Sequence, residues 1–183
     1  MRPFCLNAES SLFLMIDIQE RLLPAMSDGK KVLAEAERLL RAAAAMEIPV
    51  LATEQYPKGL GPTVEPLRSL IKPELTLPKT AFCCFGAEGF PELLARQGRF
   101  SVVVFGIESH ICVLATAMKL LEHGYDVVVA EEACSSRQKA HHDLAMRNLL
   151  AAGAAVLPVE SVVYQLMYRA GTPLFKSLLP LFK

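Results

Sequence analysis

The sequence lacks a net charge. Lysine and arginine together number 19, as do aspartate and glutamate, so the formal net charge is +0 with neutral histidines. A chain without an overall field does not attract nucleic acid or an acidic membrane surface. The balance therefore predicts a small neutral or mildly polar ligand, or none, with neither nucleic acid nor a membrane as a partner.

Long apolar runs and a cysteine framework are also absent. No apolar run approaches the length that crosses a bilayer, and "MRPFCLNAES" has no continuous apolar region before a cleavage site. The five cysteines are an odd number without even spacing. A chain of 183 residues can build a core without disulfides, so we expect reduced thiols in a soluble, cytoplasmic protein.

No linker, charge block, low-complexity segment or internal repeat interrupts the chain, which predicts a single domain over residues 1–183. Instead, apolar runs alternate with helical patterns. The strand candidates are "SLFLMID", "IPVLAT", "ELTLPK", "FSVVVFG", "YDVVVA" and "AAVLPV". The helix candidates are residues 28–46 with Asp28 as a cap, "VEPLRSLI", "GFPELLARQG", the segment from Ile111, residues 137–152 closed by Gly153, and most of the tail.

Strands with little alternation, each followed by a helix, predict a doubly wound α/β domain. Its mainly parallel six-stranded sheet is expected to carry helices on both faces. In such sheets the chemistry gathers outside the carboxyl ends of the strands. Asp17 ends the first strand, Thr53 the second and Lys79 the third, and residues 106–112 follow the fourth. Their convergence predicts a functional site at this edge.

Cys112 follows the fourth strand by only a few residues, within the first turn of a predicted helix. Unpaired backbone N–H groups and the helix dipole stabilise a thiolate there, and Ser109 is placed to cap the helix. A nearby lysine would lower the thiol pKa further, and a carboxylate could accept the proton. Asp17 and Lys79 are the candidates for these two roles.

Three motifs carry a resemblance to a known family. They are "LMIDIQ" with Asp17, "LPKTAFCCF" with Lys79, and "GIESHICVLATA" with Cys112. In this order, they resemble the isochorismatase-like cysteine hydrolases over nearly the whole chain. The segments "TEQYPKGLGPT" and "ACSSR" look like the branch of isochorismatase-domain hydrolases with unassigned substrates, rather than the nicotinamidases.

The resemblance implies a catalytic role for each of the three side chains. Cys112 would be the nucleophile, Asp17 the general base and Lys79 the cation that positions the pair. A cis peptide bond between Ile107 and Glu108 is implied as well, turning the Glu108 N–H toward the Cys112 N–H to form an oxyanion hole. The implied enzyme cleaves a C–N bond of a small amide-like substrate through a Cys112 thioester, without a cofactor.

One departure concerns metal binding. Nicotinamidases of this superfamily hold a metal through a D-x-H type motif after the second strand, but "ATEQYPKGLGPT" contains neither histidine nor aspartate. The four histidines all lie beyond residue 109 and form no metal-ligand pattern with the cysteines. We therefore expect no metal. A vinyl ether hydrolase of the isochorismatase type stays an alternative, although only Lys58 and Arg137 would be obvious partners for its two substrate carboxylates.

Several further residues are candidates for the substrate pocket. They are Gln19, Tyr56, Phe82, Phe85 and His110. For His110 two interpretations stay open, a pocket residue or a cap of a neighbouring element. The cysteines other than Cys112 are expected to be small buried hydrophobic residues; they are Cys5, Cys83, Cys84 and Cys134.

Two alternatives to a hydrolase come from other functional classes. One is a non-catalytic oligomeric binding or scaffold protein that keeps the fold. The other is a redox-sensing thiol protein built on the same edge. The apolar tail "VVYQLMYRAGTPLFKSLLPLF" offers surface for a subunit interface, and the family is commonly oligomeric, so we expect a homo-oligomer, a dimer or higher.

Overall fold

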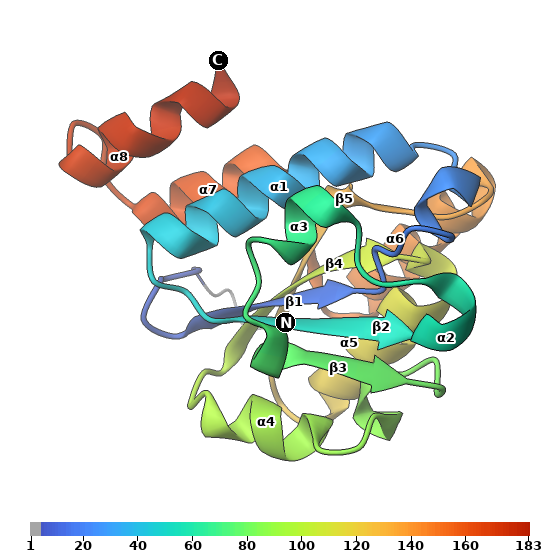
Figure 1. Ribbon diagram of the computed structural model, residues 1–183. Coiled ribbons are helices and arrows are strands. Elements are labelled where there is room, and N and C mark those ends of the chain that lie inside the picture. Colours follow the sequence, from blue (N-terminus) through green and yellow to red (C-terminus); the bar gives the residue numbers. More distant parts are fainter. Residues whose placement is uncertain (1–4) are drawn as a thin grey trace.

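A sheet of six parallel strands forms the centre of the protein, whose computed structural model describes residues 5–183 (Figure 1). The strand order is β3-β2-β1-β4-β5-β6, and every neighbouring pair is parallel. The strands are β1 (Ser11–Ile16), β2 (Val50–Gln55), β3 (Thr76–Lys79), β4 (Ser101–Ile107), β5 (Asp126–Ser135) and β6 (Ala155–Leu157). The predicted parallel six-stranded sheet is confirmed.

Helices cover the two faces of the sheet (Figure 1). On one side α1 (Gly29–Ala45) contacts α3 (Glu65–Arg68), α7 (Val159–Met167) and α8 (Pro173–Leu178). On the other side lie α4 (Phe90–Arg96) and α5 (Leu114–Glu122), and α5 contacts α6 (Lys139–Ala152). The short helix α2 (Pro57–Leu60) follows β2. No helix within residues 5–183 combines the length and the apolar character that spanning a membrane requires.

The two central strands explain why their sequences show no alternation. Every residue of β1 and β4 is buried, since both faces of the sheet are covered. Phe13 and Phe105 pack edge to face with ring centroids 6.2 Å apart. Burial on both sides therefore selects continuous apolar runs, which is the pattern that identified these strands.

Some predicted helix ends need correction. Asp28 precedes α1, but its side chain makes no capping hydrogen bond. The helix expected from Arg137 begins at Lys139, while Gly153 ends it in a left-handed conformation, as predicted. The fifth strand is longer than expected because β5 continues past Ala130 to Ser135. The ends of helices and strands are hard to predict because they depend on hydrogen bonds to residues whose positions the sequence does not give.

The apolar tail covers the core of its own chain. Helix α7 buries Val162, Val163 and Leu166, and α8 buries Leu178. The ring of Tyr164 packs edge to face against Phe175 and Phe182, which lie in α8 and in the turn η5 (Leu179–Phe182). Much of the surface that we expected to offer a subunit interface is thus used within the chain.

The sheet reverses its strand order between β1 and β4, the place where ligands bind in open α/β sheets. Gly106 allows the two strands to approach closely at this point. Its φ is +133°, and a Cβ there would lie 2.1 Å from the Ile16 carbonyl oxygen. Only glycine fits such an approach. The strand ends that carry Asp17 and the turn to Cys112 are therefore adjacent.

Candidate active site

Asp17, Lys79 and Cys112 meet at this switch point. Lys79 Nζ lies 2.6 Å from Asp17 Oδ2 and 3.6 Å from Cys112 Sγ. The Asp17 and Lys79 side chains are both 0% exposed, and Cys112 is 6% exposed. Three residues that are remote in sequence thus form one buried cluster, in the arrangement that the sequence predicted.

Asp17 is held through both carboxylate oxygens. Oδ2 accepts the bond from Lys79, and Oδ1 accepts a 2.7 Å bond from Thr53 Oγ1. The Asp17 backbone has a positive φ of 55°, and its N–H donates to the Thr53 carbonyl at 3.1 Å. Aspartate tolerates this conformation better than most residues. The side chain is consequently fixed in its orientation between Thr53 and Lys79.

Gln55 is a member of the cluster that sequence reasoning missed. Its Oε1 accepts a 2.6 Å bond from Lys79 Nζ, and its Nε2 donates to the Thr80 carbonyl at 2.8 Å. Alternation along β2 places Thr53 and Gln55 on the same face of the sheet, and that spacing was a usable signal. Gln55 is thus a second acceptor, beside Asp17, that holds the Lys79 ammonium in place.

The Lys79 ammonium is stabilised by its neighbours. Burial alone would lower the pKa of Lys79, but the adjacent Asp17 carboxylate and the Cys112 sulfur act in the other direction, and the net shift is upward. Lys79 is therefore a cation at neutral pH, paired with an anionic partner inside the protein.

The Cys112 thiol is protonated at rest, which corrects our expectation of a stabilised thiolate. Burial raises the pKa of Cys112 to about 12, the Asp17 carboxylate adds to the rise, and Lys79 opposes it only in part. Loss of hydration and a nearby anion outweigh the influence of the lysine. The Asp17 carboxylate is close enough to raise the pKa of the thiol, so it is the candidate acceptor for the Cys112 proton.

A tight turn brings Cys112 into place. The peptide bond between Ile107 and Glu108 is cis, and a π-helical turn, η4 (Ser109–Val113), follows it and leads into α5. The Glu108 carbonyl accepts hydrogen bonds from the N–H groups of Ile111 at 3.1 Å and Val113 at 3.2 Å. Ser109 does not cap this turn as expected; its Oγ lies 2.9 Å from His142 Nδ1 instead.

The isochorismatase domain model matches residues 11–161, most of the chain and all three of these side chains. The chain belongs to the isochorismatase domain family. The isochorismatase domain-containing protein 1 of Danio rerio is 36% identical over 178 residues, which cover 97% of this chain and 62% of that protein. This chain thus spans less than two thirds of that relative.

Two solved structures show the same fold. The MAR1 ribonuclease of Caenorhabditis elegans has a TM-score of 0.90 at 31% identity, covering 98% of this chain and 92% of that one. The YcaC gene product of Escherichia coli, described as an octameric hydrolase of unknown specificity, has a TM-score of 0.93 at 21% identity, covering 100% and 91%. The fold is that of the isochorismatase-like hydrolases.

Gln19 and Tyr56, two of the expected pocket residues, make contacts that link the loops around the sheet edge. Gln19 is fully buried; its Oε1 accepts from the Gln55 N–H at 2.8 Å, and its Nε2 donates to the Gly61 carbonyl at 2.6 Å. It ties the segment after β1 to the end of β2 and to the loop that follows β2. Tyr56 is 54% exposed at the rim, and its N–H donates to the Lys79 carbonyl at 2.8 Å.

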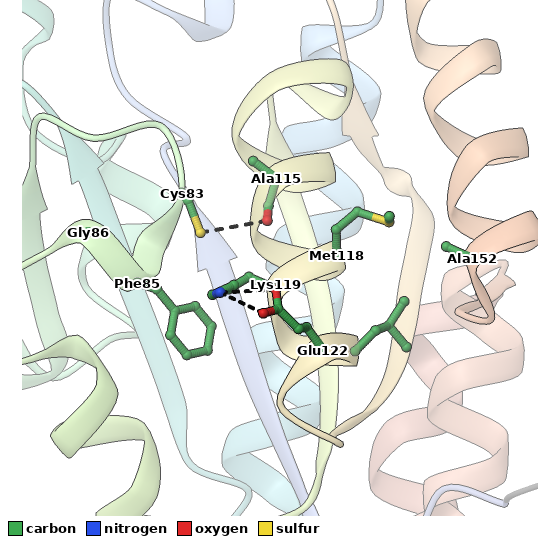
Figure 2. A pocket seen from close by; sticks show the side chains of 9 residues that line it. Cys83, Phe85, Gly86, Ala115, Met118, Lys119, Glu122 and Ala152 are labelled. Carbon is green, nitrogen blue, oxygen red and sulfur yellow. Dashed lines mark hydrogen bonds and ion pairs between the residues drawn. The ribbon is translucent and has the colours of Figure 1, made fainter.

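The structure does not bring Phe85 to the cluster. Its ring packs against Phe90 and against His123, at the far end of α5, with centroids 5.4 Å and 4.6 Å apart. Phe85 lines a hollow on the outer surface that also includes Met118 and Lys119, whereas Asp17, Lys79 and Cys112 do not line it (Figure 2). Phe82 is 61% exposed. Phe85, which we expected in the substrate pocket, therefore lies in a hollow that does not include the three clustered side chains.

His110 lies beside the end of β5. Its Nδ1 is 2.9 Å from Ser136 Oγ, and its ring is tilted by 48° against that of His141, with centroids 4.8 Å apart. Burial lowers the pKa of His110, against the opposing influence of Glu108. The imidazole therefore links the turn after β4 to the loop after β5, which agrees with the capping interpretation more than with the pocket interpretation.

The other cysteines differ in their surroundings. All five cysteines are free; Cys84 and Cys134 are buried as expected, Cys83 is half-buried, and Cys5 is exposed, contrary to expectation. Burial raises the pKa of both Cys84 and Cys134 to about 12. Within residues 5–183, no three histidine, cysteine, aspartate or glutamate side chains gather in a way that could hold a metal ion.

Proposed function

We propose that the protein is a metal-independent cysteine hydrolase that cleaves the C–N bond of a small amide-like substrate. Cys112 is the nucleophile, Asp17 the general base and Lys79 the positioning cation. The observation that supports this most directly is the placement of Lys79 Nζ, 2.6 Å from Asp17 Oδ2 and 3.6 Å from Cys112 Sγ in a buried cluster. A nucleophile, a base and an orienting group within reach of one another are what covalent catalysis requires.

The reaction begins with a neutral thiol. As the substrate carbonyl approaches, Asp17 takes the Cys112 proton and the sulfur forms a bond to the carbonyl carbon. Because burial raises the pKa of Cys112 to about 12, the free thiolate is unfavourable, and we propose that proton transfer to Asp17 accompanies the attack of the sulfur. The negative charge that develops on the carbonyl oxygen is stabilised by the backbone N–H groups of Glu108 and Cys112.

The second half returns the enzyme to its starting state. Protonated Asp17 gives its proton to the leaving amine as the C–N bond breaks, leaving a thioester on Cys112. Asp17 then takes a proton from water as the water oxygen attacks the thioester carbon. When the C–S bond breaks and releases the acid, Asp17 returns this proton to the Cys112 sulfur. Thr53 holds Asp17 in place through both steps by its 2.7 Å hydrogen bond. Gln55 does the same for Lys79 by accepting a 2.6 Å hydrogen bond.

A screen of small amides, ureides and hydroxamates tests this proposal, with intact-mass detection of acyl-enzyme. We expect one compound class to add an acyl group at Cys112 and to be hydrolysed. The variant Cys112→Ala should fold and lose both signals, whereas Cys84→Ala, which removes a neighbouring buried thiol, should keep them. Turnover that survives in Cys112→Ala would contradict the proposal.

A nucleic acid substrate has less support. The Caenorhabditis elegans relative is described as a ribonuclease. Binding of a phosphate backbone depends on clustered lysine and arginine, and this chain has no excess of either over its acidic residues. We therefore propose a small molecule as substrate. An RNA cleavage assay with Cys112→Ala as the comparison would reveal a ribonuclease, and we expect no cleavage above that background.

Self-association and a cytoplasmic location complete the proposal. The Escherichia coli structure is described as octameric. In this chain apolar side chains gather on the α5 and α6 surface, where Met118 is 45% exposed and Leu150 is 49% exposed. We expect light scattering to give a mass of at least a dimer, and Met118→Glu to lower it. A monomer at micromolar concentration would contradict this part of the proposal.

A further inference from the structure

The end of β5 lies directly beside the turn that carries Cys112. Ile107 pairs with Ser135 across the two strands, so the residues that follow, Glu108 on one side and Ser136 and Arg137 on the other, are neighbours. Cys112 is four residues beyond Glu108, in the turn η4. The loop after β5 is therefore a wall of the same edge, next to the nucleophile.

Arg137 is anchored in this loop by the Glu108 carboxylate. Glu108 Oε2 accepts from Arg137 Nε at 3.1 Å and from the Arg137 backbone N–H at 3.4 Å. The Glu108 side chain is only 11% exposed, whereas that of Arg137 is 60% exposed. Glu108 is thus the buried partner of the ion pair, and the Arg137 guanidinium extends from it toward the surface.

The outer part of the guanidinium is left for another anion. Among the contacts within residues 5–183, Glu108 engages Nε and the backbone N–H, and none engages either Nη atom. A guanidinium offers several N–H donors in a planar fork, which matches the two oxygens of a carboxylate. With Nε fixed, the orientation of the two Nη groups is restricted before any ligand arrives.

A surface ion pair without further purpose is the plain alternative. Exposed pairs contribute little to stability, about 0 to 1 kcal/mol. The Arg137 pair differs from the other arginine pairs, because those with Glu37 and Glu65 lie within single helices, three or four residues apart. Arg137 and Glu108 are 29 residues apart and join the two loops that flank the nucleophile.

We propose that Arg137 binds a carboxylate of the substrate, so that the amide cleaved at Cys112 belongs to a small carboxylate-bearing molecule. The inference rests on the proposed function and names its substrate class. It modifies the expectation of a neutral ligand, since a balanced total charge does not describe the local charge at one loop. Glu108 is already engaged by Arg137 Nε, and His110 Nδ1 lies 3.9 Å from the same carboxylate oxygen, Glu108 Oε2.

Paired alkylating reagents test this without knowledge of the substrate. Iodoacetate and iodoacetamide are similar in size, but only the first carries a carboxylate; 3-maleimidopropionate and its amide form a longer pair. The rates at Cys112 are measured by peptide mapping, at low ionic strength because exposed charges are screened by salt. Within each pair the anionic-to-neutral rate ratio cancels the reactivity of the thiol itself.

In Arg137→Ala we expect the ratio for at least one pair to fall about fivefold or more, the size of a modest ionic contact. Arg147→Ala, an exposed arginine on α6, should leave both ratios unchanged. The double variant Glu108→Gln/Arg137→Ala keeps the local charge balanced. Its ratio should stay low, because the guanidinium is what binds the carboxylate.

Three outcomes are decisive, and they separate the carboxylate inference from the hydrolase proposal. Unchanged ratios in Arg137→Ala overturn the carboxylate inference and leave the hydrolase proposal standing. A ratio that returns to the original value in the double variant also overturns it, since the unpaired Glu108 charge would then explain the loss. Alkylation of Cys112 no faster than that of the buried Cys84 would contradict the hydrolase proposal, which requires a sulfur that small molecules can reach, and the inference with it.

Discussion

Thr53 Oγ1 donates a 2.7 Å hydrogen bond to Asp17 Oδ1, on the oxygen that Lys79 does not use. The carboxylate is thereby held from two sides by groups on two different strands. A buried carboxylate needs such donors, because it has lost its hydration. The geometry of this pair makes Thr53 a positioning residue for Asp17, the proposed base.

Replacing Thr53 by valine should weaken both stability and turnover. The change leaves Asp17 Oδ1 without its donor, and a hydrogen bond to a charged group contributes about 1.5–3 kcal/mol. Urea unfolding should show a loss of that size, and kcat should fall about tenfold or more as the carboxylate loses its orientation. Thr53→Ser keeps the hydroxyl and should restore most of both. Equal turnover in the valine and serine variants would contradict the positioning role.

Removing the Lys79 charge should destabilise the fold more than removing both charges of the pair. Lys79→Met leaves the Asp17 carboxylate buried without its cation, which costs about 3–5 kcal/mol in other proteins. The double variant Asp17→Asn/Lys79→Met contains no unpaired charge and should recover most of that loss while staying inactive. Chemical denaturation of the three proteins measures the difference. A double variant that is less stable than Lys79→Met would argue against the ion pair.

The three buried thiols should make the protein sensitive to alkaline pH. Burial raises the pKa values of Cys84, Cys112 and Cys134 from 9.0 to about 12. Above pH 9 the unfolded chain loses these protons and the folded chain keeps them, so the free energy of unfolding falls as pH rises toward 12. The slope is about 1.4 kcal/mol per pH unit for each thiol. Denaturation series above pH 9 should show a shallower slope in Cys84→Ala than in the unmodified protein.

A methyl group at Gly106 should disrupt the switch point. Its Cβ would lie 2.1 Å from the Ile16 carbonyl oxygen, so the two central strands would have to separate. We expect Gly106→Ala to lose at least about 3 kcal/mol of stability, or to remain unfolded. Gly124→Ala is a matched control, since Gly124 also has a positive φ but no atom within 4 Å of the added Cβ. It should cost only about 1–2 kcal/mol. Similar losses at both positions would contradict the steric explanation.

Positions at the ends of the strands could be predicted from sequence, but the direction of side chains could not. Asp17 and Lys79 were identified because each ends an apolar run, and the carboxyl ends of parallel strands share an edge. The sequence alone does not show which of the two glutamines, Gln19 or Gln55, faces Lys79. Their exchange of hydrogen bonds, with Gln55 facing Lys79 and Gln19 facing the loop at Gly61, depends on how β1 and β2 are paired.

The sequence by itself determined the parallel sheet, the succession of strands and helices along the chain, and the residues at the carboxyl edge of the sheet, because apolar patterning and turn residues act locally. The tertiary structure decided the surroundings of those residues, and with them their burial, their ion pairs and their protonation. It placed Phe85 on the outer surface, anchored Arg137 on Glu108, and left the Cys112 thiol protonated with a pKa of about 12. Each of these depends on burial and on charges brought together from distant parts of the chain, and a local pattern does not contain them.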